Sequence, residues 1–256
     1  LPHITASASN PDLTKPGHKT TFRLIANDNA LGAALALFGA DHLKLKSVAI
    51  IDDRTAYGQG VASVFKATAQ QKGLKVVAEE FTNDKATDFM AILTAIKNKK
   101  PDAIFYGGLD AQAGPMLRQM EQLGLGNVKF FGGDALCTEK LPELSGKTPA
   151  LKNVTCATGG ASVDKMQGGS DWKKRYDAKF PGQFQIYSPY AYDAAMVLAD
   201  AMKRANSVDP KVFTPSLAKT EHKGVTANIA FTAKGELTTP AVTLYTFKDG
   251  GRVALN

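Results

Sequence analysis

The chain has 256 residues, of which 44% are hydrophobic and 21% charged, and its formal net charge is +7. This is the profile of a folded globular protein with one large domain or two of modest size. It argues against a membrane-spanning segment, because no apolar run approaches the roughly 20 residues required. It also argues against a nucleic-acid partner, because no basic stripe is interleaved with aromatic residues.

The first predicted elements are a strand end, a loop, a strand and a helix. Residues 4–14 pass from the strand end into small residues and an Asn-Pro turn. Ser7 and Ser9 add hydroxyls to backbone groups that small side chains leave open, which suits the capture of a small polar ligand. An ordinary serine-rich loop shows the same pattern. A short strand over 20–25 and a helix over 29–40 follow.

Strand and helix then alternate between residues 46 and 134. The expected strands are 46–51, 76–78, 103–106 and 128–131. The expected helices run over 59–72, from Asp88, and through the apolar positions of 116–123. The short connections between them predict right-handed βαβ crossovers and a parallel sheet.

Two of these strands end in a glycine pair followed by a carboxylate. Leu109 and Asp110 follow the first pair, and Asp134 follows the second. In open α/β sheets ligands bind at the carboxyl ends of the strands, so both carboxylates are candidate binding groups. The same pattern also fits two ordinary turns between a strand and a loop.

The remaining chain continues with helices and ends in strands. A strand over 154–158 precedes expected helices over 171–180, 189–205 and 211–217. Strands over 226–231 and 241–247 then lead to a hairpin turn at Asp249-Gly250. A β tail after an α/β body predicts a segment that returns to an earlier sheet.

The usual catalytic, cofactor and metal patterns are absent from the sequence. The four histidines are isolated, and no spacing suits a metal site. No dinucleotide fingerprint, phosphate-binding loop or nucleophile elbow is present, so no cofactor is expected. Asp110 and Asp134 are the residue types of an acid/base pair, which keeps a hydrolase as one alternative. Nothing near them in the sequence supplies a nucleophile or an oxyanion hole.

The two cysteines, Cys137 and Cys156, each lie just after a predicted strand. A disulfide between them would close a loop of about 20 residues and contribute about 3 kcal/mol. It would also imply an oxidising compartment. Two reduced, buried thiols are the alternative.

Five stretches in order along the chain carry a family resemblance. They are residues 6–14, 50–53 with Tyr57-Gly58, 106–108 with 116–119, 131–134, and 187–193. Together they resemble the periplasmic binding proteins of branched-chain amino acid ABC transporters, the leucine/isoleucine/valine-binding type. No single stretch is specific, whereas the ordered set is.

The resemblance implies an α/β, two-lobed type I periplasmic binding protein. Its parallel, Rossmann-like sheets are joined by three crossovers, and the ligand lies in the cleft between the lobes. Residues 1–26 and 158–235 would form a partial N-terminal lobe, and residues 27–157 and 236–256 the C-terminal lobe.

The resemblance also implies that the first lobe is incomplete. Members of the family begin with several βα units before the segment that matches Leu1. The opening residues have neither an initiator methionine nor the basic region of a signal peptide, so we expect a processed chain or part of a longer one. Without those units the lobe would expose a sheet edge, and we expect self-association or a second chain that completes it.

The resemblance assigns the polar ends of the ligand to three residues. Ser9 corresponds to a threonine that contacts both ends of the amino acid, with Ala8 beside it. Asp134 corresponds to the acidic residue that accepts from the ligand's ammonium. Aspartate in place of glutamate shortens the reach by one methylene, about 1.5 Å.

Four further residues are assigned to the walls of the site. Tyr57 matches an aromatic residue at the cleft, and Tyr187 one that lines the side-chain pocket. Leu109 stands where well-known members have a tyrosine, and Asp110 follows it. This departure leaves the side-chain preference open.

The function implied is that of a periplasmic solute-binding protein without catalytic activity. It would capture a branched-chain or other apolar amino acid and deliver it to the permease of an ABC importer. A ligand sensor of the same fold is an alternative, and the hydrolase is another.

Overall fold

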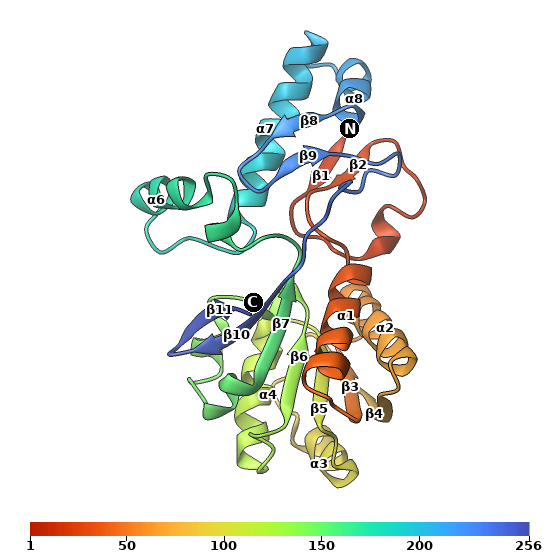
Figure 1. Ribbon diagram of the computed structural model, residues 1–256, viewed down its shortest axis with the longest axis vertical. Helices are drawn as coiled ribbons and strands as arrows, with labels where there is room; N and C mark the ends of the chain where they lie inside the picture. Colours follow the sequence, from red (N-terminus) through yellow and green to blue (C-terminus); the bar gives the residue numbers. More distant parts are fainter. Residues whose placement is uncertain (256) are drawn as a thin grey trace. The chain divides into compact units, whose positions relative to one another are not determined.

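The computed structural model describes residues 1–255, which form two compact units (Figure 1). Unit 1 comprises Leu1–Asn27 and Gly159–Ala241; unit 2 comprises Asp28–Thr158 and the residues from Val242 onward. The chain therefore passes from one unit to the other three times. The last expected residue of the tail, Asn256, lies outside the described residues.

The third passage lies after Ala241, whereas the expected boundary was after residue 235. The segment between them stays with unit 1 because its backbone is paired there. Arg23 N donates to the carbonyl of Gly235 over 2.8 Å, and Phe231 forms a β-bridge with Leu237. The assignment of unit 1 to the family's N-terminal lobe stays a prediction.

Unit 2 is built on a seven-stranded sheet of order β11-β10-β7-β6-β5-β3-β4. Its strands are β3 (Ser47–Asp52), β4 (Lys75–Phe81), β5 (Ala103–Gly107), β6 (Lys129–Gly132), β7 (Val154–Thr158), β10 (Thr243–Lys248) and β11 (Gly251–Ala254). Strands β3 to β7 are parallel, as predicted. Strand β10 returns from the C-terminal tail to pair antiparallel with β7, which confirms the expected return to an earlier sheet.

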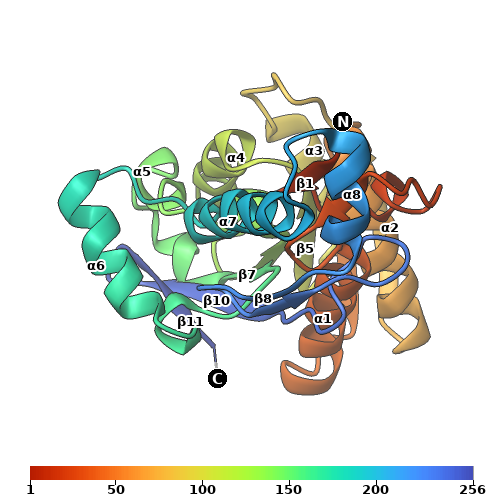
Figure 2. The same ribbon diagram turned by 90° about the horizontal axis from the view of Figure 1, so that it is seen from above.

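Helices cover both faces of this sheet. They are α1 (Asp28–Leu37), α2 (Ala56–Gln71), α3 (Met90–Lys99) and α4 (Asp110–Gln122), with a short α5 (Leu141–Leu144). Alternate residues of β3 enter two different apolar clusters, one shared with α1 and α2 and the other with α3 and α4. Figure 2 shows α4 and α1 on opposite sides of the strands. The central residues of β3, β5 and β6 are apolar because both faces of these strands are buried.

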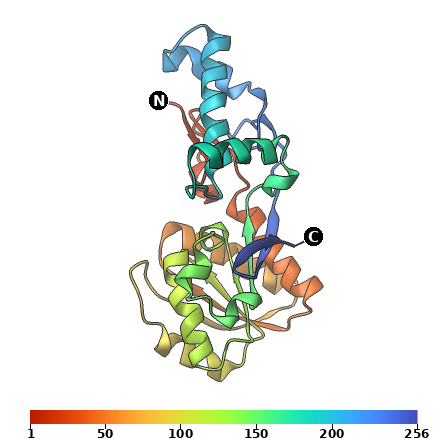
Figure 3. The same cartoon turned by 90° about the vertical axis from the view of Figure 1, so that its left-hand side faces the viewer.

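Unit 1 contains two small sheets and three helices. Strands β1 (His3–Thr5) and β2 (Thr21–Arg23) are parallel, and β8 (Glu221–Lys223) and β9 (Asn228–Ala230) form an antiparallel hairpin. The helices are α6 (Gly169–Lys179), α7 (Ser188–Ala205) and α8 (Pro210–Ala218). Helix α7 is the longest of the unit, with 18 residues (Figure 3). Its buried face, with α8 and the strands, forms a single apolar cluster.

Strand β8 was not expected from the sequence. Its residues Glu-His-Lys are polar and mostly exposed, so they lack the alternation that marks a strand. None of the described helices combines the length and hydropathy of a bilayer span.

Candidate functional site

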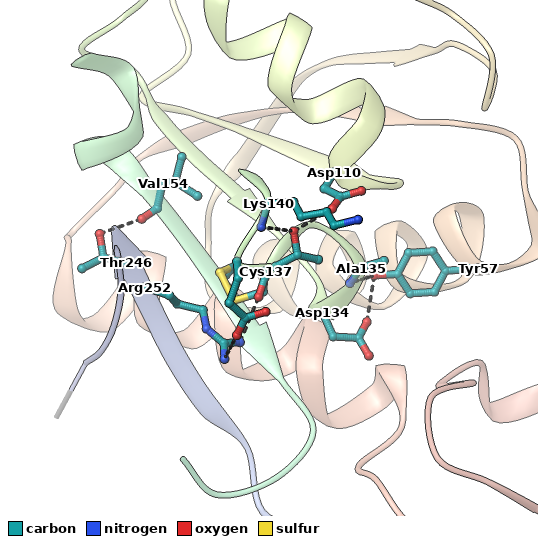
Figure 4. The surroundings of a disulfide bond; sticks show 12 residues. Tyr57, Asp110, Asp134, Ala135, Cys137, Lys140, Val154, Thr246 and Arg252 are labelled. Carbon is teal, nitrogen blue, oxygen red and sulfur yellow. Dashed lines mark hydrogen bonds and ion pairs between the residues drawn. A yellow bond between two sulfur atoms is a disulfide. The ribbon is translucent and has the colours of Figure 1, made fainter. Parts of the chain in front are cut away.

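In unit 2 the carboxylate of Asp134 is buried, with 1% of its surface exposed. Strand β6 ends at Gly132, and Asp134 opens the 3₁₀ turn Asp134–Leu136. The Tyr57 hydroxyl donates to Asp134 Oδ1 over 3.0 Å and accepts from the backbone N–H of Ala135 over 3.2 Å (Figure 4). Tyr57 therefore holds both the carboxylate and the turn that carries it.

Tyr57 lies in the first turn of α2, and a chain of hydrogen bonds fixes that turn. Asp53 Oδ1 accepts from the Thr55 backbone N–H over 2.9 Å and from the Thr55 hydroxyl over 2.6 Å. The Thr55 hydroxyl in turn accepts from Gly58 N over 2.9 Å, which is an N-cap. Asp53 is thus a positioning residue that the sequence did not single out, although the pattern Asp-x-Thr-x-x-Gly was readable as a capped helix start.

Glycines at the strand ends allow the close approach of α2. The backbones of Gly107 and Gly58 are so close that a Cβ on either would collide with the carbonyl oxygen of the other. A Cβ at Gly133 would collide with the Tyr57 hydroxyl. Two of the predicted turn glycines, Gly107 and Gly133, therefore allow the close approach of α2 that brings Tyr57 to Asp134.

The second predicted carboxylate has a different environment. Asp110 lies in the first turn of α4, and its Oδ2 accepts from the Thr138 hydroxyl over 2.6 Å (Figure 4). Leu109, just before the helix, has 40% of its surface exposed. The carboxylate of Asp110 is thus directed to the loop that follows Asp134.

A disulfide ties that loop to the sheet. Cys137 and Cys156 are joined, with their Cα atoms 5.4 Å apart, so the bridge links the loop to β7. Arg252 on β11 donates to the Cys137 carbonyl over 2.9 Å and pairs with Glu139 over 2.8 Å (Figure 4). Of the two alternatives for the cysteines, the structure has the disulfide.

In unit 1 the loop after β1 carries Ala8 and Ser9. The Thr5 hydroxyl accepts from Ser7 N over 3.2 Å and from Ala8 N over 2.8 Å, which turns the chain tightly. Ser9 is 2% exposed, and its hydroxyl makes no hydrogen bond to any group of residues 1–255. Buried hydroxyls without a hydrogen-bond partner are uncommon, and Ser9 is one of the few among residues 1–255.

Tyr187 is also in unit 1, directly before α7, and is half-buried. The structure therefore places Ala8, Ser9 and Tyr187 in unit 1, and Tyr57, Leu109, Asp110 and Asp134 in unit 2. Within residues 1–255 no group of three or more histidine, cysteine or acidic side chains is arranged to hold a metal ion.

The sequence pattern of a family described as periplasmic binding protein matches residues 1–252. The chain belongs to the periplasmic binding protein family. This is a family of binding proteins rather than enzymes, which removes the hydrolase alternative.

Curated relatives of this periplasmic binding protein include proteins named for the amino acids that they bind. It is 30% identical over 248 residues to Leu/Ile/Val-binding protein homolog 1 of Brucella suis, a match that covers 96% of this chain and 66% of the relative. It is 29% identical over 250 residues to a leucine-, isoleucine-, valine-, threonine- and alanine-binding protein of Pseudomonas aeruginosa, covering 97% of this chain and 66% of the relative. The chain thus spans about two thirds of the length of these relatives.

Solved structures confirm the fold of this periplasmic binding protein. A leucine-binding protein from Thermotoga maritima superposes with a TM-score of 0.92 at 26% identity, over 100% of this chain and 72% of that one. A branched-chain amino acid binding protein from Streptococcus pneumoniae, in complex with isoleucine, gives a TM-score of 0.85 at 23% identity, again over 100% and 72%. The expected type I α/β architecture is therefore confirmed.

Proposed function

We propose that this chain binds an amino acid, branched-chain or otherwise apolar, and serves as the solute-binding component of an ABC importer. The observation that carries the proposal is the buried Asp134 carboxylate at the carboxyl end of β6, held by Tyr57. The names of relatives at about 30% identity give the same ligand class.

The chemistry of the proposed site follows from the two charges of an amino acid. A buried ammonium needs an anionic acceptor, which Asp134 supplies. A buried carboxylate needs donors, for which we propose the Ser9 hydroxyl and other backbone N–H groups of the same loop. Ala8 would contact the ligand beside Ser9, since its own N–H donates to the Thr5 hydroxyl. Tyr57, Leu109, Asp110 and Tyr187 are the proposed contacts of the ligand's side chain, and apolar contacts would contribute about 0.8 kcal/mol per CH₂.

We also propose a periplasmic location and the permease of an importer as the macromolecular partner. The family and the disulfide between Cys137 and Cys156 support the location, because disulfides persist in oxidising compartments.

Calorimetric titration with the twenty amino acids tests the proposal, with Asp134→Asn as the diagnostic variant. Asp102→Asn is a matched control, because Asp102 directly precedes β5 and so belongs to the opposite edge of the same sheet. We expect the wild type and the control to bind leucine, isoleucine or valine alike, and Asp134→Asn to bind at least about 100-fold more weakly.

Two outcomes contradict the proposal. If the wild type binds none of the twenty amino acids, the ligand class is wrong. If Asp134→Asn binds as the wild type does, the Asp134 carboxylate does not contact the ligand.

A further inference from the structure

Unit 1 contains a fully buried positive charge that the binding site described above does not use. Arg23 ends strand β2, and its side chain is 0% exposed. A buried guanidinium is costly unless it is paired and hydrogen-bonded, so the groups around it indicate its role.

One partner of Arg23 neutralises its charge. Arg23 Nε lies 3.1 Å from Glu236 Oε2 and 3.3 Å from Oε1, and Nη2 lies 3.2 Å from Oε1. Glu236 is 213 residues further along the chain, five residues before the chain leaves unit 1 at Ala241. Thr14 joins the pair, since its hydroxyl donates to Glu236 Oε1 and accepts from Arg23 Nη2 over 3.2 Å.

The other partners of Arg23 belong to the loop that carries Ser9. Arg23 Nη1 donates to the carbonyl of Ala8, and Nη2 donates to the carbonyl of Asn10 over 2.9 Å. These two carbonyls flank Ser9 on either side. The planar fork of one guanidinium therefore fixes the residues before and after Ser9 at the same time.

We propose that Arg23 is the positioning residue of the ligand loop, defined as residues 5–14. It holds Ser9 in the conformation in which the buried hydroxyl has no partner among residues 1–255 and is available to the ligand's carboxylate. This inference rests on the proposed role of Ser9 in amino-acid binding.

The geometry requires arginine rather than any cation. Neutralising Glu236 takes a single charge, and a lysine at position 23 can do that. A lysine ammonium is a point donor on a flexible stem and cannot copy the fork that reaches Glu236, Ala8 and Asn10 together. A variant that keeps the charge and loses the fork therefore separates the two roles.

Arg23→Lys is tested by hydrogen exchange of residues 5–14 and by calorimetric titration with leucine. We expect faster hydrogen exchange in the ligand loop and at least a tenfold loss of leucine affinity. The thermal unfolding transition of the variant should stay cooperative, which shows that it is folded. Asp193→Asn is the matched control. Asp193 is a buried carboxylate of the same unit whose oxygens accept from Val225 N and Thr226 N, outside the loop. It should speed exchange around Val225 and leave leucine affinity unchanged.

A second variant covers the case in which Arg23→Lys does not fold. Arg23→Gln combined with Glu236→Gln removes both charges, so no unpaired charge stays buried, and it also removes the fork. The same loop-specific exchange and the same loss of affinity are expected. Wild-type affinity in this double variant overturns the inference.

The two readouts separate the inference from the proposed function. Unchanged loop exchange and unchanged leucine affinity in Arg23→Lys overturn the positioning role and leave the proposed function standing. Failure of the wild type to bind any amino acid overturns the proposed function. In that case faster loop exchange in Arg23→Lys still shows that Arg23 holds the loop, and unchanged exchange shows that it does not.

Discussion

Removing only the hydroxyl of Tyr57 isolates the contact that holds the Asp134 carboxylate in unit 2. Tyr57→Phe keeps the ring and deletes the oxygen that donates to Asp134 Oδ1 over 3.0 Å and accepts from Ala135 N over 3.2 Å. The carboxylate and its turn then lose their shared anchor, while the backbone path through β6 is unchanged.

The size of the effect follows from the charge of the acceptor. A hydrogen bond to an ionised group contributes about 1.5–3 kcal/mol, and every 1.4 kcal/mol is a tenfold change in affinity. If the bond serves to hold Asp134 for the ligand's ammonium, Tyr57→Phe should weaken leucine binding by about 10- to 100-fold. Stability should fall by about 1–3 kcal/mol, because the deletion leaves the buried carboxylate without this donor.

Isothermal calorimetry with leucine and a thermal melt measure both quantities. Tyr192→Phe is the control, since Tyr192 lies on α7 of the other unit with 40% of its surface exposed. The affinity of this variant for leucine should equal that of the wild type. Leucine affinity within twofold of the wild type in Tyr57→Phe would refute the argument that this hydroxyl prepares Asp134 for the ligand.

Three further predictions concern unit 2. Reduction of the Cys137–Cys156 disulfide, which spans 19 residues, should lower the free energy of unfolding by about 3 kcal/mol in a denaturant titration, and an unchanged midpoint would contradict it. Gly107→Ala should destabilise by about 1–3 kcal/mol in thermal melts, because its Cβ meets the Gly58 carbonyl, and wild-type stability would disprove the need for close approach. Hydrogen bonds from the backbone N–H of Lys46 and, to a smaller extent, of Ser47 lower the pKa of Asp102 from 3.8. Asp102→Asn should therefore lower the free energy of unfolding by less than about 1 kcal/mol at pH 7. The difference in the free energy of unfolding between wild type and variant should disappear below pH 3.8 as the wild-type carboxylate protonates. A difference that grows as the pH falls would show that the carboxylate does not stabilise the fold in its ionised form.

The sheet of unit 2 was predictable because its signals are local. Short apolar runs predict buried parallel strands, and the structure has them at β3, β5 and β6, the last two ending at a glycine. The return of β10 to β7 was also indicated by the change of pattern in the tail. Strand β8 was missed because it is held by its pairing with β9 rather than by apolar residues of its own.

The candidate site was predictable only where residue type itself indicates chemistry. Asp134 stands out as a carboxylate after a glycine pair, and Ser9 as a hydroxyl among small residues. Arg23 does not stand out, because its meaning depends on Glu236, and no local pattern connects residues 213 positions apart. The sequence likewise predicts a turn at Gly107 and cannot show that a helix backbone approaches it.

Asp134 is held by a neutral donor, whereas the loop that carries Ser9 is held by an arginine whose charge is neutralised by Glu236. Each arrangement suits the ligand group proposed to bind there. In unit 2 a neutral tyrosine hydroxyl donates to Asp134, the proposed acceptor for the ligand's ammonium. In unit 1 the cation that organises the loop is itself neutralised by Glu236, and its donors are directed to Ala8 and Asn10. A free arginine beside Ser9 would bind any small anion. An arginine paired with Glu236 orders the loop and leaves recognition of a carboxylate to neutral donors, which favours a zwitterion over a simple anion.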